Sequence, residues 1–201
     1  MSTSRDQPFF FSLVHISFIF VTRLLNKLFD YFRILSLDVA FGGVVLSASL
    51  AQAFGMSLPF TIVLGLFLAI WLIYSFDHLL DAQKLRESAS MRRHKFHFEN
   101  RKTILIVMMI MMLVGLGNMI FMPVITLIMG LIVTFFVAFY FFLSWKFKLF
   151  LIKEVFIASI YATGVVLGPV SLGGIDQASL FFIIFQFFGL ALLNLLIISN
   201  Y

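Results

Sequence analysis

Six long apolar runs, separated by short polar links, constrain the fold of this chain more than any other feature. A helix needs about 20 apolar residues to cross the hydrocarbon core of a bilayer. Lipid offers no partner to unpaired backbone groups, so runs of this length must be helical. The sequence therefore predicts an all-α, polytopic transmembrane helical bundle with about six spans. The predicted spans cover residues 34–55, 58–76, 103–121, 124–144, 150–170 and 180–199.

The composition excludes a soluble domain. Hydrophobic residues make up 62% of the 201 residues, and charged residues make up 11%. A soluble domain is about half apolar and about a quarter charged. The chain contains no cysteine, which excludes disulfides and thiol-based metal sites.

The distribution of basic residues predicts the orientation in the membrane. Lys and Arg lie before the first predicted span, between the second and third, and between the fourth and fifth. The links on the other side carry none. The positive-inside rule places the basic regions in the cytoplasm. We therefore expect a multi-pass protein of the inner (cytoplasmic) membrane of a cell, with membrane lipid as its partner and no nucleic acid bound.

Residues 1–33 are expected to form an N-terminal interfacial segment, ahead of a bundle that covers residues 34–201. The apolar stretch 8–22 has only about fifteen residues, which is short for a span. Arg23, Lys27 and Asp30 then recur at helical spacing. This pattern favours a helix that lies in the membrane interface, and a seventh span is the alternative.

Small residues recur every four positions in two of the predicted spans. Small-xxx-small spacing lets the backbones of neighbouring helices approach closely, so these faces are expected to pack inside the bundle. They are Gly43, Ser47, Ala51 and Gly55 in the first span, and Gly164 and Gly168 in the fifth.

Asp77 and Asp81 are the leading candidates for chemistry. They stand where the second span meets the long basic loop 77–102. On a helix, like charges four residues apart repel each other, and both would face the negative end of the helix dipole. A bound Mg²⁺ would offset both effects, because it takes one or two protein carboxylates and completes its shell with water and phosphates. The alternative is a solvated helix end, with Asp81 paired to Lys84 or to neighbouring arginines.

The basic residues that follow extend this hypothesis. Arg92 and Arg93 are candidates to neutralise phosphates through bidentate contacts. An equally open alternative is that these arginines only set the membrane topology and contact anionic lipid. Carboxylates followed by cations, at the mouth of an apolar bundle, suit a substrate with a diphosphate head and a hydrocarbon tail.

Other polar residues carry a weaker signal. The loop histidines His78, His94 and His97 have no distinctive zinc spacing, and we expect them to be solvated. Asp38 lies about one turn inside the first span, where an ionisable residue is a functional candidate. An interfacial ion pair with Arg33 or another basic residue is the alternative.

The segment that ends in these aspartates resembles the first aspartate motif of the UbiA superfamily of intramembrane prenyltransferases, Asn-Asp-x-x-Asp-x-x-x-Asp. Asp77 and Asp81 match its last two aspartates, and Ile73 and Tyr74 stand where the motif has Asn-Asp. Lys146 matches a lysine that is typical of the family after the fourth helix.

The resemblance extends further along the chain, with two departures. The stretch from Lys153 and Glu154 to Pro169 is similar to the fifth helix of the family. Phe142 stands where the family has a tyrosine four residues before the lysine, and Tyr140 is close by. The family carries a second aspartate motif near the end of its sixth helix and has nine helices. The sequence here stops after the sixth span, which favours a truncated chain.

The resemblance implies a Mg²⁺-dependent transfer of a prenyl group from a prenyl diphosphate to a small acceptor. Asp77 and Asp81 would be the catalytic and metal-binding residues, and Arg92, Arg93 and Lys146 would contact the substrate phosphates. The alternative is a non-catalytic or truncated multi-pass membrane protein, either a degenerate relative or an assembly partner. Phosphatidyl transfer fits less well, because the longer motif of that chemistry does not precede Asp77.

Overall fold

The computed structural model describes residues 7–85, 92–146, 150–173 and 175–199, and this part of the chain contains eight helices and no strand. The predicted all-α helical bundle is confirmed. The helices are α1 (Gln7–Ile34), α2 (Leu37–Ala53), α3 (Phe60–Leu85), α4 (Arg92–Glu99), α5 (Arg101–Met119), α6 (Val124–Lys146), α7 (Phe150–Ser171) and α8 (Gln177–Ser199).

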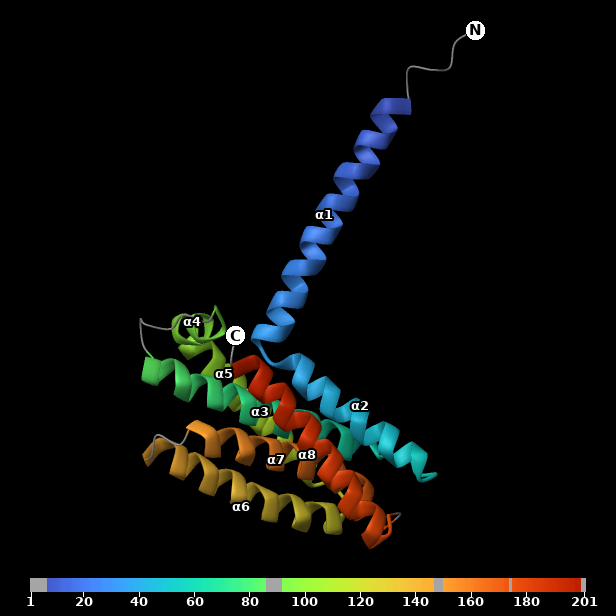
Figure 1. Ribbon diagram of the computed structural model, residues 1–201, viewed down its shortest axis with the longest axis vertical. Coiled ribbons are helices and arrows are strands. Elements are labelled where there is room, and N and C mark those ends of the chain that lie inside the picture. The colour runs from blue at the N-terminus through green and yellow to red at the C-terminus, as the bar shows by residue number, and fades with distance from the viewer. Residues whose placement is uncertain (1–6, 86–91, 147–149, 174, 200–201) are drawn as a thin grey trace.

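The long helices α2, α3 and α5–α8 form the bundle, and α3 and α7 lie at its centre. Helix α3 packs against α2, α5, α6 and α7, and α7 packs against α2, α3, α6 and α8. The short helix α4 packs mainly on α3. In Figure 1, α1 projects away from one end of this bundle. We call this the basic end, because α3 ends and α7 begins there, beside the segments that carry the Lys and Arg residues.

The lengths of the helices mark a multi-pass membrane protein. Five helices in the described chain are long and apolar enough to cross a bilayer on their own: α3, α5, α6, α7 and α8. Helix α2 has only 17 residues, and it qualifies as a sixth span only together with the end of α1. The predicted first span therefore differs from the other five.

A sharp bend at Ser36 separates α1 from α2. Residues 21–34 and 37–53 meet at an angle of 76°. Ser36 adopts the left-handed conformation, with φ 55° and ψ 26°, which costs a non-glycine residue about 1–2 kcal/mol. Such strain persists only where the surrounding structure fixes it. Two contacts from α3 do so: Trp71 donates from Nε1 to the carbonyl oxygen of Leu35 at 3.0 Å, and His78 Nε2 lies 3.1 Å from Ser36 Oγ.

Most of the predicted small residues lie at helix contacts, but the prediction is wrong for Gly55, which is exposed beyond the end of α2. Gly43, Ser47 and Ala51 are buried on one face of α2. A Cβ at Gly43 would overlap the side chain of Ile70, so α2 and α3 approach closely there. In α7, a Cβ at Gly168 would lie 2.9 Å from Ile62 Cγ2. The close contacts of α3 with α2 and with α7 therefore depend on glycines, which have no side chain.

Burial decreases from the centre of the bundle outward. In α7, 50% of the spanning window is buried, whereas in α8 only 6% is buried. The outward faces of α5, α6 and α8 carry exposed large apolar side chains, such as Leu113, Phe135 and Phe185. Hydrocarbon tails are as apolar as leucine, so these faces suit contact with lipid.

Candidate functional site

Asp77 and Asp81 lie on α3, not in a loop. The helix continues to Leu85, so both aspartates fall within its last three turns. Asp77 is 5% exposed, and Asp81 is partly buried. A solvated helix end, which the sequence left open, does not describe Asp77.

Asp77 is held by a tyrosine from another helix. Tyr140 on α6 donates from Oη to Asp77 Oδ1 at 2.8 Å, and its side chain is only 2% exposed. This hydrogen bond fixes the orientation of the Asp77 carboxylate. The ring of Tyr140 also stacks on Phe156 of α7, with centroids 6.3 Å apart. Helices α3, α6 and α7 therefore meet at this carboxylate.

The contact of Tyr140 with Asp77 was the hardest feature of the site to predict from the sequence. The family pattern puts a tyrosine at position 142, but Phe142 is 54% exposed and turned away from the bundle. Two residues on a helix are about 200° apart, so 140 and 142 lie on opposite faces. The usable signal was the single tyrosine in a run of phenylalanines, because a buried hydroxyl needs a partner.

Another side of α3 holds a pair of buried histidines, His78 of α3 itself and His97 of α4. His78 is 9% exposed and shares a hydrogen bond with the fully buried Ser36. Its ring meets the ring of His97 on α4 edge to face, with centroids 5.4 Å apart. His97 is only 1% exposed. The expectation that these histidines are solvated was wrong for His78 and His97, because they join α2, α3 and α4, and the side chain of His94 lies outside the described residues.

The proposed phosphate contacts lie at the basic end, but their side chains are not described. Arg92 and Arg93 begin α4, and Lys146 is the last residue of α6. All three backbone positions therefore lie at the ends of helices that surround the end of α3. Their contact with Asp77 or Asp81 is a prediction that falls outside the described side chains.

The donor set suits Mg²⁺ better than zinc. Among the described residues, no group of three or more His, Asp or Glu side chains is placed to hold a metal ion. Zinc sites use three or four protein ligands, whereas Mg²⁺ is commonly bound by one or two carboxylates together with water and substrate phosphates. Asp77 and Asp81, one turn apart on one face of α3, fit the second case.

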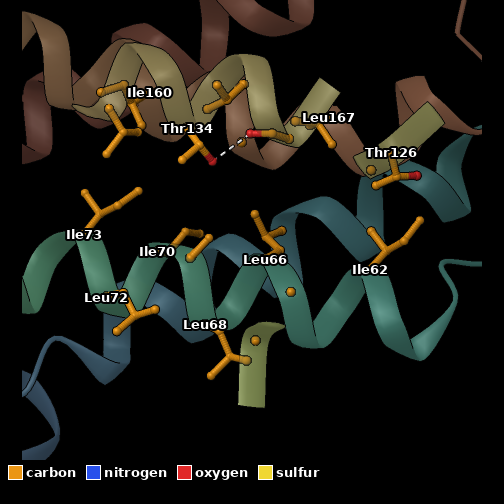
Figure 2. A pocket seen from close by; sticks show the side chains of 18 of the residues that line it. Ile62, Leu66, Leu68, Ile70, Leu72, Ile73, Thr126, Thr134, Ile160 and Leu167 are labelled. Atoms are coloured by element: carbon orange, nitrogen blue, oxygen red, sulfur yellow. Dashed lines mark hydrogen bonds between the residues drawn. The ribbon is translucent and has the colours of Figure 1, made fainter. Parts of the chain in front are cut away.

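An apolar cavity of about 370 Å³ lies between α3, α5, α6 and α7, and its lining on α3 ends three residues before Asp77. In Figure 2, Leu66 and Ile73 of α3 face Ile160 and Leu167 of α7 across it. The lining runs along α3 from Ile62 to Tyr74, which corresponds to about 18 Å of helix. Only a few hydroxyl groups interrupt this apolar lining, among them those of Thr126 and Thr134. Its volume lies within the range of small-molecule sites.

Asp38 has no salt bridge in the described chain. Its Oδ1 is buried in the first turn of α2 and accepts no hydrogen bond from the described residues. The ion pair with Arg33, one of the two alternatives that the sequence left open, is therefore not seen. The N-terminal end of a helix favours a negative charge, which gives Asp38 one source of stabilisation. Glu154, 8% exposed near the start of α7, is a further buried acid at the basic end, and it is not among the site residues predicted from the sequence.

The comparisons with known proteins give no identity. No protein-family model, no curated protein and no solved structure matches this chain.

Proposed function

We propose that this protein is a UbiA-like prenyltransferase, which transfers a prenyl group from a prenyl diphosphate to a small acceptor. One observation carries the proposal. The cavity-lining residues Leu66, Ile70 and Ile73 recur at helical spacing on α3, and the same spacing leads on to Asp77 and Asp81. One helix face therefore offers an apolar wall and then two carboxylates, which is the order of polarity in a prenyl diphosphate.

The residues of the chain have separable tasks in this proposal. Tyr140 keeps the Asp77 carboxylate in one orientation, which limits the reorganisation needed when a charged head arrives. The cavity takes the hydrocarbon tail and excludes water from the reacting carbon. The bond between that carbon and the diphosphate oxygen breaks, and the diphosphate leaves with the electron pair. The carbon then bonds to the acceptor, which releases a proton.

Mg²⁺ belongs to this proposal as a cofactor held by Asp77 and Asp81. Bound there, it would supply positive charge to the leaving diphosphate. Arg92, Arg93 and Lys146 would add phosphate contacts from the ends of α4 and α6. The orientation follows from the same charges: the basic end faces the cytoplasm, in the inner membrane of the cell.

The test is Mg²⁺-dependent binding of farnesyl diphosphate to the purified full chain in lipid nanodiscs. We expect saturable binding that Asp77→Asn and Asp81→Asn each weaken about 10- to 100-fold, because a lost charged contact in a buried site costs about 1.5–3 kcal/mol. Asp176→Asn is the matched control, since this aspartate lies in the link before α8, far along the chain from the site, and is exposed. Transfer of a radiolabelled prenyl group to an acceptor in a membrane extract is the second readout.

A second candidate function rests on Ile73 and Tyr74. Both line the cavity, and they occupy the positions where the family has Asn-Asp. A non-catalytic relative or assembly partner would lose these polar groups and keep the bundle. Absence of saturable binding by the unmodified chain, or unchanged binding by both aspartate variants, would replace the first candidate with this one.

A further inference from the structure

Helix α1 is divided lengthwise into an apolar and a polar face over its described side chains. Val21, Leu24, Leu25, Leu28 and Phe29 recur at the i, i+3, i+4, i+7 spacing of one helix face. Each of these side chains is between 48% and 60% exposed. The polar residues recur with the same spacing on the other face: Arg23, Asn26, Lys27, Asp30 and Arg33.

The direction of α1 separates it from the spanning helices. It lies at 76° to α2, and in Figure 1 it points away from the basic end of the bundle. Transmembrane helices tilt by about 20° from the bilayer normal on average. If the bundle stands across the membrane, α1 therefore runs close to the membrane plane.

The junction makes this direction a fixed property of the fold. The strained backbone at Ser36 is held by Trp71 and His78, both on α3. The last turns of α1 also pack on the bundle through Phe32 against Phe41 and Tyr31 against Phe96, with ring centroids 5.6 and 6.0 Å apart. Among the described residues, ring contacts of this kind reach α1 only near its end.

We propose that α1 lies in the headgroup region of the leaflet at the basic end and binds anionic lipid there. Its apolar face would enter the acyl boundary, and Arg23 and Lys27 would meet the headgroup phosphates. An in-plane amphipathic helix with basic residues on its polar face is suited to this position. Two basic side chains beside an apolar stripe complement an anionic bilayer surface, whereas a protein partner would have to supply both an apolar groove and matching acids.

Helix α1 would also set the depth of the candidate site. Ser36 lies at the bend between α1 and α2 and contacts His78. His78 follows Asp77 directly in the chain. If α1 lies among the headgroups, Asp77 lies at nearly the same depth, where lipid-anchored phosphates are found. This inference does not depend on the proposed enzymatic function.

The experiment uses single-cysteine labelling of the full chain, which has no cysteine of its own. Spin labels at Leu24→Cys and Leu28→Cys report on the apolar face, and a label at Asn26→Cys reports on the polar face. The protein is placed in nanodiscs of phosphatidylcholine alone, or of equal parts phosphatidylcholine and phosphatidylglycerol. Collisions with oxygen, which dissolves in lipid, are compared with collisions with a water-soluble nickel chelate.

We expect oxygen access at 24 and 28, chelate access at 26, and deeper immersion in the anionic nanodiscs. Lys27→Gln should lower the immersion equilibrium about fivefold in anionic nanodiscs, since one basic residue near such a surface contributes about 1 kcal/mol. It should have little effect in neutral nanodiscs, and Asn26→Gln serves as the matched control. Elution of each variant as a single species shows that the bundle remains folded.

Three other outcomes would overturn the proposal. Oxygen access at all three positions, with the chelate excluded, would mean that α1 spans the membrane. Exclusion of both reagents, together with spin–spin coupling that disappears on dilution with lipid, would mean that α1 packs against a second copy. Chelate access everywhere would place α1 in water.

Discussion

Asp77 and His78 are neighbours on α3, and both are buried. Consecutive residues on a helix point about 100° apart, so the two side chains meet different neighbouring helices. Asp77 turns to α6 and accepts a hydrogen bond from Tyr140, beside the end of an apolar cavity. His78 turns to α2 and α4 and meets Ser36 and His97. The first side is a buried carboxylate three residues beyond Tyr74, where the cavity lining on α3 ends. The second is filled by rings and a hydroxyl, and it joins three helices.

The difference shows that burial of a polar residue does not by itself mark a functional site. The histidine side holds the bend that directs α1, so its loss would affect the fold. The aspartate side continues the helix face that lines the cavity, so under the proposed function its loss would affect binding. Variants on the aspartate side should therefore lose ligand binding, and variants on the histidine side should lose stability.

The largest expected effect is the contrast between Asp77→Asn, which should lose binding, and His78→Ala, which should lose stability. Asp77→Asn should weaken farnesyl diphosphate binding about 10- to 100-fold and change the thermal unfolding temperature little, because an amide oxygen still accepts from Tyr140. His78→Ala should lower the free energy of unfolding by about 1–3 kcal/mol, because it leaves a buried hydroxyl at Ser36. Binding per folded molecule should stay unchanged in His78→Ala. Equal loss of binding in both variants would contradict the division of α3 into two sides.

Tyr140→Phe tests the aspartate side more finely. It removes the hydroxyl that donates to Asp77 and keeps the ring that stacks on Phe156. A hydrogen bond to a charged group is worth about 1.5–3 kcal/mol, so we expect binding to weaken about tenfold. Phe142→Leu, on the outward face of the same helix, should bind normally. Isothermal titration of the two variants decides whether the tyrosine at 140 serves the site.

Trp71→Phe tests the histidine side at a smaller scale. The indole donates to the carbonyl of Leu35 at the bend, and phenylalanine keeps most of the apolar contact. We expect a loss of about 0.5–1.5 kcal/mol in the free energy of unfolding. Distance measurements between labels on α1 and α3 should also show a broader range of bend angles. An unchanged distribution would mean that His78 alone fixes the bend.

Asp176 offers an exposed carboxylate for comparison with the buried Asp77. Its Oδ1 accepts from the backbone N–H of Ser179 in the first turn of α8, and hydrogen bonds to Ser179 hold the pKa of Asp176 below its ordinary value. Stabilisation by Asp176 is then fully present above the unfolded pKa of about 3.9 and is lost as pH falls through the lower folded value. Asp176→Asn should show a slightly smaller loss of unfolding temperature below pH 4 than the unmodified chain. Identical acid profiles would mean that this cap has no measurable effect.

Much of the fold followed from the sequence because lipid leaves few alternatives. The predicted spans 58–76, 103–121, 124–144, 150–170 and 180–199 lie within or closely match single helices. The run 34–55 also forms a helix, but the break at Ser36 shortens it to α2. Hydropathy does not report such a break, because a left-handed residue depends on contacts from a distant helix.

The site was less predictable than the fold, for a physical reason. Spacing placed Asp77 and Asp81 on one face, and the structure keeps them there. The partner of Asp77 comes from position 140, 63 residues away, and periodicity within one helix cannot identify it. The burial of His97 had no local signal either, because α4 is rich in charged residues and its buried face is set by packing on α3.

Three of the residues that line the cavity are methionines: Met112, Met119 and Met122. Met122 reaches toward Gly65, where any added side chain would overlap it. Unbranched thioethers change rotamer easily and adapt to differently shaped guests, so under the proposed function this wall would tolerate prenyl chains of several lengths. The same sulfur atoms are open to oxidation, and a sulfoxide would introduce a polar group into an apolar space. Peroxide treatment followed by peptide mass spectrometry would show whether an occupied cavity protects these methionines.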